Sequence, residues 1–195
     1  MAELPPRRRV RDAELMRALA HPLRAALLSY LMSAGPRTAS ECATAVGSTP
    51  SNCSWHLRQL ARFGLVEPDA GAGGRERPWR AGQVGLELGE WAADPAVRGA
   101  QLAATGAMVG QEQELTQRYL DTLDELPAEW REAAALNAYA LRVTAAELAE
   151  LVDAVDRLLR PYVGTLRADV PAGARPVHVG LRAFLRIDAD GESSA

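Results

Sequence analysis

The sequence has 195 residues, of which 48% are hydrophobic and 24% are charged, which is enough for one large or two small globular domains. No apolar run reaches the roughly 18 residues that cross a bilayer, and no apolar stretch of signal-peptide type follows the basic N-terminus, so we expect a cytoplasmic protein without a membrane partner. Its two cysteines exclude a disulfide scaffold and any metal site built on several thiolates.

The net charge of −3 is divided unevenly along the chain. Residues 1–82 hold twelve arginines against seven acidic residues, whereas residues 83–195 hold ten arginines against eighteen acidic residues. Every basic side chain except the three histidines is an arginine, because the sequence contains no lysine. A basic first half is what a module that binds phosphate groups requires. Chance segregation of the charges is the alternative.

Two helices are predicted at the start of the chain. Residues 1–10 form a Pro/Arg-rich tail that we expect to be disordered. A helix over residues 12–20 begins at a capping aspartate, Asp12, and ends where His21-Pro22 breaks the pattern. Pro22 then suits the first turn of a second helix, which runs to about residue 33 and ends before Gly35-Pro36.

A helix-turn-helix is predicted next. A short helix over residues 39–46 is closed by Gly47, and Thr49-Pro50 starts another helix that stops at Gly64. The apolar positions of this second helix lie on one face, while polar side chains cover the other. Two short helices joined by a glycine-containing turn, the second with an exposed polar face, are typical of a helix-turn-helix.

A hairpin follows the motif. Residues 65–67 are short and extended, residues 69–74 are rich in turn-forming glycine, and residues 75–80 read as an arginine-rich return strand. This hairpin would be the wing of a winged helix. We therefore assign residues 11–82 to a winged helix-turn-helix DNA-binding domain.

The order of these pieces resembles the winged-helix repressors of the ArsR/SmtB type. The resemblance rests on three stretches, Leu19-Ala-His-Pro-Leu-Arg24, Ser51-Asn-Cys-Ser-Trp-His-Leu-Arg-Gln-Leu60 and Gly64-Leu-Val66, together with the Gly/Arg wing. It covers about 70 residues and implies a dimeric DNA-binding protein. Metal-sensing members bind their ion through paired cysteines on the third helix or through His/Asp pairs on the long helix. This chain has one cysteine, Cys42, on the third helix and no histidine in residues 95–126, so we expect a member that does not sense metals.

Residues 83–195 are assigned to dimerisation and to effector binding. A long helix over residues 95–126 carries small residues at intervals along one side, which would let a partner helix approach; a weak or kinked helix is the alternative. A capping box predicts a helix over residues 145–160. Strict alternation predicts a strand over residues 177–187, which could pair with residues 133–143. The fold class is therefore mainly α with a small β component (α+β), in which the long helix is followed by a small α/β unit.

The candidate DNA-binding residues lie on the predicted recognition helix and wing. A helix in the major groove reads base edges with short polar or bidentate side chains, and amide groups at its N-terminus suit a phosphate. Wing arginines would reach the DNA backbone or minor groove, and the Arg7–Arg9 run could act as a minor-groove arm. The candidates are Thr49, Ser51, Asn52, Ser54, Trp55, His56, Arg58, Gln59, Arg75, Arg77 and Arg80.

Enzymatic function is not indicated. We find no nucleophile–base–acid set, P-loop, dinucleotide fingerprint or metal cluster, and we expect no cofactor and no metal. Cys42 and Cys53 fall on apolar helix faces, where free cysteine packs as a small hydrophobic residue. Six aromatic residues of the second half are candidates either for an effector pocket or for an ordinary core: Trp91, Tyr119, Trp130, Tyr139, Tyr162 and Phe184.

These observations favour a sequence-specific transcriptional regulator, a repressor that binds double-stranded DNA as a homodimer on an inverted repeat. A small-molecule effector is a further candidate partner. The alternative is a winged-helix module that uses its exposed helix to hold a protein and does not bind DNA.

Overall fold

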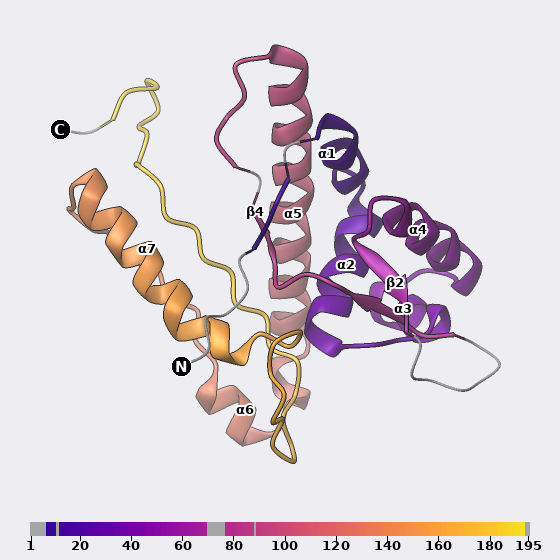
Figure 1. Cartoon of the computed structure of the whole chain (residues 1–195). Coiled ribbons are helices and arrows are strands. Elements are labelled where there is room, and N and C mark those ends of the chain that lie inside the picture. The colour runs from indigo at the N-terminus through magenta and orange to yellow at the C-terminus, as the bar shows by residue number, and fades with distance from the viewer. Residues whose placement is uncertain (1–6, 11, 70–76, 88, 194–195) are drawn as a thin grey trace.

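The computed structural model describes residues 7–10, 12–69, 77–87 and 89–193 of the chain (Figure 1). In chain order the elements are β1 (Arg8–Arg9), α1 (Ala13–Leu19), α2 (Pro22–Ala34), α3 (Ala39–Val46), α4 (Pro50–Arg62), β2 (Val66–Pro68), β3 (Trp79–Ala81), β4 (Leu86–Glu87), α5 (Pro95–Asp121), the 3-10 turn η1 (Leu123–Glu125), α6 (Ala128–Ala133), α7 (Ala145–Leu159) and the 3-10 turn η2 (Arg160–Tyr162).

The first four helices begin and end where the sequence predicts. The Asp12 carboxylate accepts a hydrogen bond from the Glu14 amide at 2.8 Å, which satisfies an otherwise unpaired donor at the start of α1. Thr38 and Glu41 form a capping box at the start of α3. Gly47 ends α3 with a φ of 66°, a left-handed conformation that glycine adopts without steric cost. The mainly α winged-helix architecture is therefore confirmed.

One hydrophobic core lies among α1, α2, α3, α4, the wing and the start of α5. Its largest fully buried side chains come from the winged-helix part: Met16, Leu19, Leu27, Leu28, Leu31, Leu57, Leu60, Leu65, Val10 and Val66. The long helix α5 closes this core with small residues, since Ala100 and Ala104 are buried against it. The domain thus holds α4 by its apolar face and leaves the opposite face free.

The wing is an antiparallel hairpin of β2 and β3, with Glu67 opposite Arg80 and Pro68 opposite Trp79. Trp79 also exchanges two backbone hydrogen bonds with Arg37, at 2.9 and 2.7 Å, so the wing is attached to the connection between α2 and α3. The tip of the wing, residues 70–76, lies outside the described residues, and with it the candidate Arg75.

The expectation of a disordered tail is wrong for its last residues. Arg8 and Arg9 form β1, which runs parallel to β4, and Val10 is fully buried. The Arg8 guanidinium donates to the carbonyl oxygens of Phe63 and Gly64, at 2.7 Å each. Hydrogen bonding to the end of α4 and burial of Val10 together order this segment.

The second half departs from the prediction in its strands. Residues 134–144 connect α6 to α7 without regular structure, and residues 177–186 run as an unpaired extended segment (Figure 1). The strands predicted over 133–143 and 177–187 are therefore not formed within the single chain, apart from an isolated bridge between Ile187 and Ser193. The alternating pattern is present, but a strand also needs a hydrogen-bonded neighbour, and no segment of the described chain lies in register beside it.

Polar contacts and one close approach, rather than a core, hold the C-terminal part to the winged helix. A Cβ on Gly164 would lie 2.9 Å from the Met32 carbonyl oxygen at the end of α2. The Thr165 hydroxyl donates to the Gln83 carbonyl at 3.2 Å. Arg182 forms an ion pair with Glu112 of α5 at 2.5 Å. Within the described ranges, no helix is both long and apolar enough to cross a membrane.

Two histidines contact each other inside the winged helix. The rings of His21, which caps α2, and His56 of α4 lie 4.5 Å apart between centroids. Burial lowers the pKa of both side chains, and the nearby Arg24 guanidinium lowers them further. The contact therefore favours the neutral form of both imidazoles.

We expect the free energy of unfolding to decrease as the pH falls from 7 toward 5. Because the pKa of both histidines is lower in the folded protein, the unfolded chain binds protons first below about 6.5, which stabilises the unfolded state. Urea unfolding followed by circular dichroism at pH 7.5, 6.5 and 5.5 measures this decrease. The double variant His21→Asn/His56→Gln should largely lose the pH dependence, whereas His178→Gln should keep it. A wild-type stability that is flat across this range would contradict the assignment.

Candidate nucleic-acid interface

The start of α4 is fixed by local hydrogen bonds. The Thr49 hydroxyl caps the helix and accepts from the Asn52 amide at 3.3 Å. The Asn52 side-chain amide donates to the Ser48 hydroxyl at 3.1 Å. The first-turn amide groups are thereby oriented outward at the positive end of the helix dipole, a position that suits an anion.

The exposed face of α4 bears most of the predicted recognition residues. Ser51, Asn52, Trp55 and Arg58 are exposed, and Ser54 and Gln59 are half-buried. The opposite face is fully buried in the core through Cys53, Leu57 and Leu60. The structure therefore places these polar side chains on one accessible surface, as the periodicity predicts.

Hydrogen bonds organise this face internally. The Arg58 guanidinium donates to the Ser54 hydroxyl at 2.7 Å, and Arg62 donates to the Gln59 side-chain oxygen at 3.3 Å. All four side chains are accessible to solvent. These hydrogen bonds therefore position the side chains, and each can be replaced by a hydrogen bond to a bound partner. Arginine presents five donors, and one bond to a hydroxyl leaves the others available.

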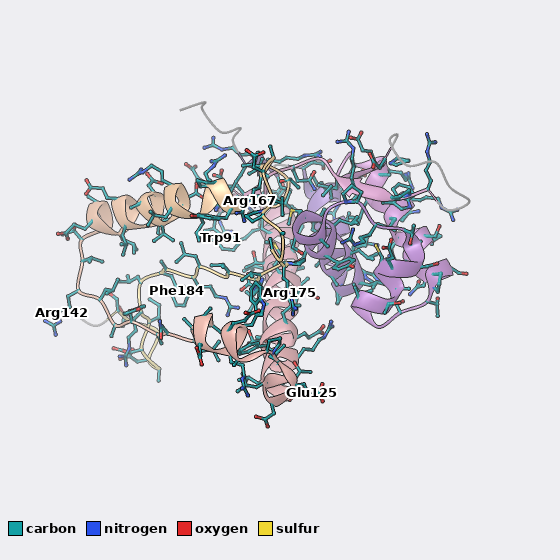
Figure 2. The ribbon with its side chains drawn as sticks, turned by 90° about the horizontal axis from the view of Figure 1, so that it is seen from below. Trp91, Glu125, Arg142, Arg167, Arg175 and Phe184 are labelled. Carbon is teal, nitrogen blue, oxygen red and sulfur yellow. The ribbon has the colours of Figure 1, made fainter. Side chains whose placement is uncertain are left out.

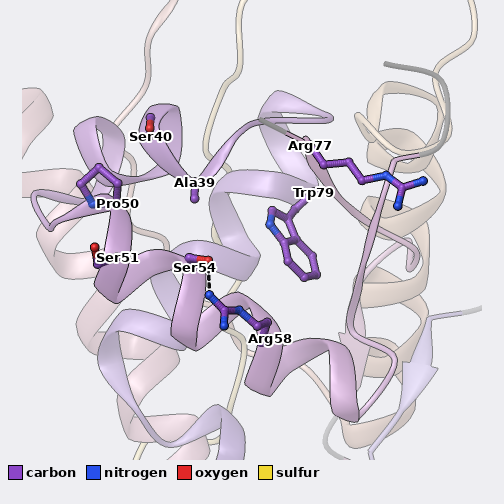
Figure 3. A pocket seen from close by; sticks show the side chains of 8 residues that line it. All are labelled: Ala39, Ser40, Pro50, Ser51, Ser54, Arg58, Arg77 and Trp79. Atoms are coloured by element: carbon purple, nitrogen blue, oxygen red, sulfur yellow. Dashed lines mark hydrogen bonds between the residues drawn. The ribbon is translucent and has the colours of Figure 1, made fainter. Parts of the chain in front are cut away.

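A groove of about 500 Å³ lies between α4 and the wing (Figure 3). Ser54 and Arg58 reach it from α4, and Trp79 reaches it from the wing. Arg77 lines its edge, and its side chain extends away from Ser54 and Arg58. The groove is lined by Ala39, Ser40, Pro50, Ser51, Ser54, Arg58, Arg77 and Trp79. It brings recognition-helix and wing residues to one surface with two arginines and no carboxylate among its lining side chains.

Two predicted site residues lie elsewhere. His56 is only 5% exposed, because it packs beneath α4 against His21 and edge-on to Trp55. It therefore supports the helix from inside and cannot touch DNA directly. Arg80 lies across the wing from Glu67 and pairs with it at 2.5 Å, with Asp69 a further partner at 3.9 Å. Its charge is balanced within the wing.

The arginines of the N-terminal run are also engaged within the chain. Arg7 pairs with Asp156 of α7, Arg8 binds the end of α4, and Arg9 lies 3.4 Å from Glu87. The arginines predicted to act as a minor-groove arm therefore bind other parts of the same chain in this structure.

Sequence reasoning missed four groove residues, Ala39, Ser40, Pro50 and Trp79. Trp79 follows Arg77 by two positions, so the alternation of a strand places both on the same side, and this signal was available. Ser40 lies in the first turn of α3, and only the packing of α3 against α4 brings it to the groove.

Both cysteines are fully buried and free. Burial raises the pKa of the Cys42 thiol to about 11 and also raises that of Cys53. Such thiols are protonated at neutral pH, and only the thiolate binds a metal ion or reacts as a nucleophile. No group of three or more His, Cys, Asp or Glu side chains that could hold a metal ion gathers in the described part of the chain.

A second cavity of about 210 Å³ lies where α1, α2 and α5 meet the segment that contains His178 and Val179. Its walls are mostly apolar, with Gln111 and Glu112 as polar groups from α5. None of the six aromatic residues proposed for an effector pocket lines this cavity or the groove. Tyr139, Tyr162 and Phe184 are instead 79%, 68% and 76% exposed.

A comparison with protein families supports the helix-turn-helix. A family model described as a helix-turn-helix domain matches residues 19–69. Among solved structures, the chain is similar to the MarR family protein Rv2887 of Mycobacterium tuberculosis in complex with salicylic acid, at 16% identity and a TM-score of 0.27, covering 74% of this chain and 88% of that one. A search of curated proteins gave no significant match.

The fold and the match define a helix-turn-helix protein of the winged kind. Residues 19–69 span α2, α3, α4 and β2, which are the elements that position the groove. The match does not single out the ArsR/SmtB type, so that subtype remains a prediction from the sequence resemblance.

We expect both thiols to resist modification in the native protein. Their burial and the raised pKa values keep the thiolate rare and inaccessible. Mass spectrometry after treatment with iodoacetamide at pH 7.5 should show negligible alkylation in buffer and two alkylated residues in urea. Rapid native alkylation of either cysteine would show that the α3–α4 core opens readily.

Proposed function

We propose that this chain is a sequence-specific DNA-binding transcriptional regulator in which α4 enters the major groove and the wing lies on the adjacent backbone. The observation that carries the proposal is the groove shared by α4 and the wing, with Arg58 and Arg77 on its two sides. Arginine binds guanine edges and phosphates through paired donors, so the groove offers both kinds of contact.

The finer proposal is a repressor that acts as a homodimer on an inverted repeat, without enzymatic activity. A single winged helix contacts one half-site, and a two-fold dimer would place two copies of α4 about 34–36 Å apart on one side of the duplex. The basic first half and the acidic second half support a molecule that presents one end to DNA. A cytoplasmic location also stays a prediction.

A small-molecule effector would bind in the second cavity, between the winged helix and α5. A ligand there would contact α2 and α5 together and could change the angle between them. This part of the proposal rests on the cavity alone.

The alternative is a protein-binding module, and one observation favours it. Trp55 is 52% exposed on the free face of α4, and exposed aromatic residues are enriched at protein interfaces. Salt separates the two functions, because phosphate contacts release counterions and give a steep decrease of affinity with salt.

We expect Arg58→Ala to weaken binding to a selected duplex by roughly 1–3 kcal/mol and to reduce discrimination between sequences, if Arg58 reads a base. Arg77→Ala should weaken all duplexes alike and reduce the salt slope by about 1. Fluorescence anisotropy at several salt concentrations, on a duplex obtained by selection from random DNA, measures both effects. Arg131→Ala, an exposed arginine of α6, is the matched control and should bind as wild type. Unchanged affinity in both groove variants would exclude this groove as the DNA surface.

We expect DNA affinity to be independent of zinc. The helix α3 holds one cysteine and α5 contains no histidine, so the chain lacks the ligand pairs of either metal site known for the resembling family. Anisotropy with added zinc and with a strong chelator should give the same affinity. Stoichiometric zinc in the purified protein that is lost in Cys42→Ser would contradict this expectation.

A further inference from the structure

The C-terminal part of the chain exposes an unusual amount of apolar side chain. Of the eighteen large hydrophobic residues that are exposed in the described chain, fourteen lie between residues 136 and 187. No described residue after Ala104 is buried. Figure 2 shows α7 and the extended segments, with Arg142 and Phe184 labelled, reaching away from the winged helix. This part of the chain has no core of its own.

The backbone of the same region is unpaired. The amides of residues 134–143 and 177–186 donate to no group in the described part of the chain. The segment 177–187 nevertheless alternates apolar residues at every second position, from Val177 to Ile187, with the pattern of a strand that has a buried face. Unpaired extended backbone of this kind is a template for pairing with another strand.

The solvent-accessible surface of the chain indicates how much area a partner could cover. The chain exposes 13500 Å². A compact folded monomer of 20.9 kDa exposes about 9,000 Å², by the scaling of surface with mass. The excess is about 4,500 Å² for each chain, or about 9,000 Å² for two copies. Obligate homodimers bury roughly 2,000–5,000 Å² and above in total, so an interface of that class would cover part of this excess.

Charge indicates which surface two copies would share. Residues 83–133, which include α5, hold three arginines against ten acidic residues. Residues 134–187 hold seven arginines against five acidic residues. Because like charges oppose self-association, the mixed-charge region suits contact between identical chains better than the acidic one does.

We propose that residues 134–143, α7 and residues 177–187 form the interface with a second copy of this chain, and that the extended segments become strands of a β-sheet shared by the two copies. The apolar stripe of α7, none of whose residues is buried in the single chain, would cover one face of that sheet. The inference deepens the proposed homodimer by naming its surface.

The N-terminal end of the segment 177–187 is already held in place. Arg182 pairs with Glu112 of α5, and a Cβ on Gly180 would lie 3.1 Å from the same carboxylate. Gly180 and Arg182 thus face α5, and both His178 and Val179 line the cavity beside it. Leu181 and Leu185, which are 50% and 65% exposed, are left for the partner.

The competing surface is the face of α5 that carries Gly99, Gly106 and Gly110. A Cβ at each of these positions meets nothing within 4 Å, so this face is also open. Its side chains are small except for Leu102, which is 57% exposed, so it offers a partner one large exposed apolar side chain near these glycines.

Sedimentation equilibrium without DNA tests the proposal, because its outcome does not depend on whether the protein binds DNA. Wild type should be a dimer, and Leu181→Asp/Leu185→Asp should weaken the dimer about a hundredfold or more, since each interface would then desolvate unpaired carboxylates. The matched control Leu102→Asp/Leu120→Asp changes two comparably exposed leucines of α5 and should remain dimeric. Gly106→Leu should also remain dimeric.

Hydrogen exchange on the wild-type dimer gives a second readout that needs no variant to fold. The amides of residues 177–186 have no partner in the single chain, so pairing with a second copy should slow their exchange about a hundredfold or more. A monomeric wild type, or a dimer in which these amides exchange at the rate of unstructured peptide, would overturn the proposal. Dimers lost in the α5 variants and kept in Leu181→Asp/Leu185→Asp would overturn it in favour of α5. Failure of duplex binding alone would overturn only the DNA-binding function.

Discussion

The packing of Ala100 and Ala104 against the winged-helix core sets the arrangement of the whole chain. These are the last buried apolar residues of the described chain, and they lie near the start of a helix of 27 residues. Their small side chains let α5 lie closely on α1 and α2, so the direction of α5 is fixed by the same core that holds α4. After Ala104 the described chain adds no buried residue to that core. The distance and angle between the two α4 copies of a dimer would therefore depend on how α5 leaves the core.

The first half of the fold could be predicted because its signals are local. Capping residues, prolines at first turns and glycines at helix ends mark each helix within a few positions, and these choices agree with the apolar periodicity. The burial of His56 could also have been predicted from the sequence, because His56 lies on the same face of α4 as the buried residues Cys53, Leu57 and Leu60. The resemblance to a DNA-reading helix directed attention to the histidine as a contact, although its position on the helix already placed it inside.

The parts that escaped prediction depend on contacts between distant segments. The two-residue strand β1 pairs with β4 almost eighty positions away, and nothing in so short a segment announces such a partner. Nothing in the sequence distinguishes Arg80 from the other wing arginines, because its ion pair with Glu67 depends on the register of β2 and β3. In the second half, the alternation at residues 177–187 predicts a segment with two faces, but periodicity describes faces and does not say which backbone will pair with them. A segment that pairs only with a second copy would show this same strand pattern in the sequence and no hydrogen-bonded neighbour in the single chain.

The bond between Arg8 and the end of α4 has a consequence for how this domain can be joined to others. Arg8 binds the two carbonyl groups that follow the recognition helix, and β1 lies beside the segment that leads into α5. A protein fused directly ahead of residue 7 would thus be connected to α4 through the ordered strand β1 and not through a flexible linker. The orientation of the fused protein would then be coupled to that of α4. A fusion at this end is therefore expected to disturb α4, and it suits a module that has to keep a fixed orientation relative to that helix.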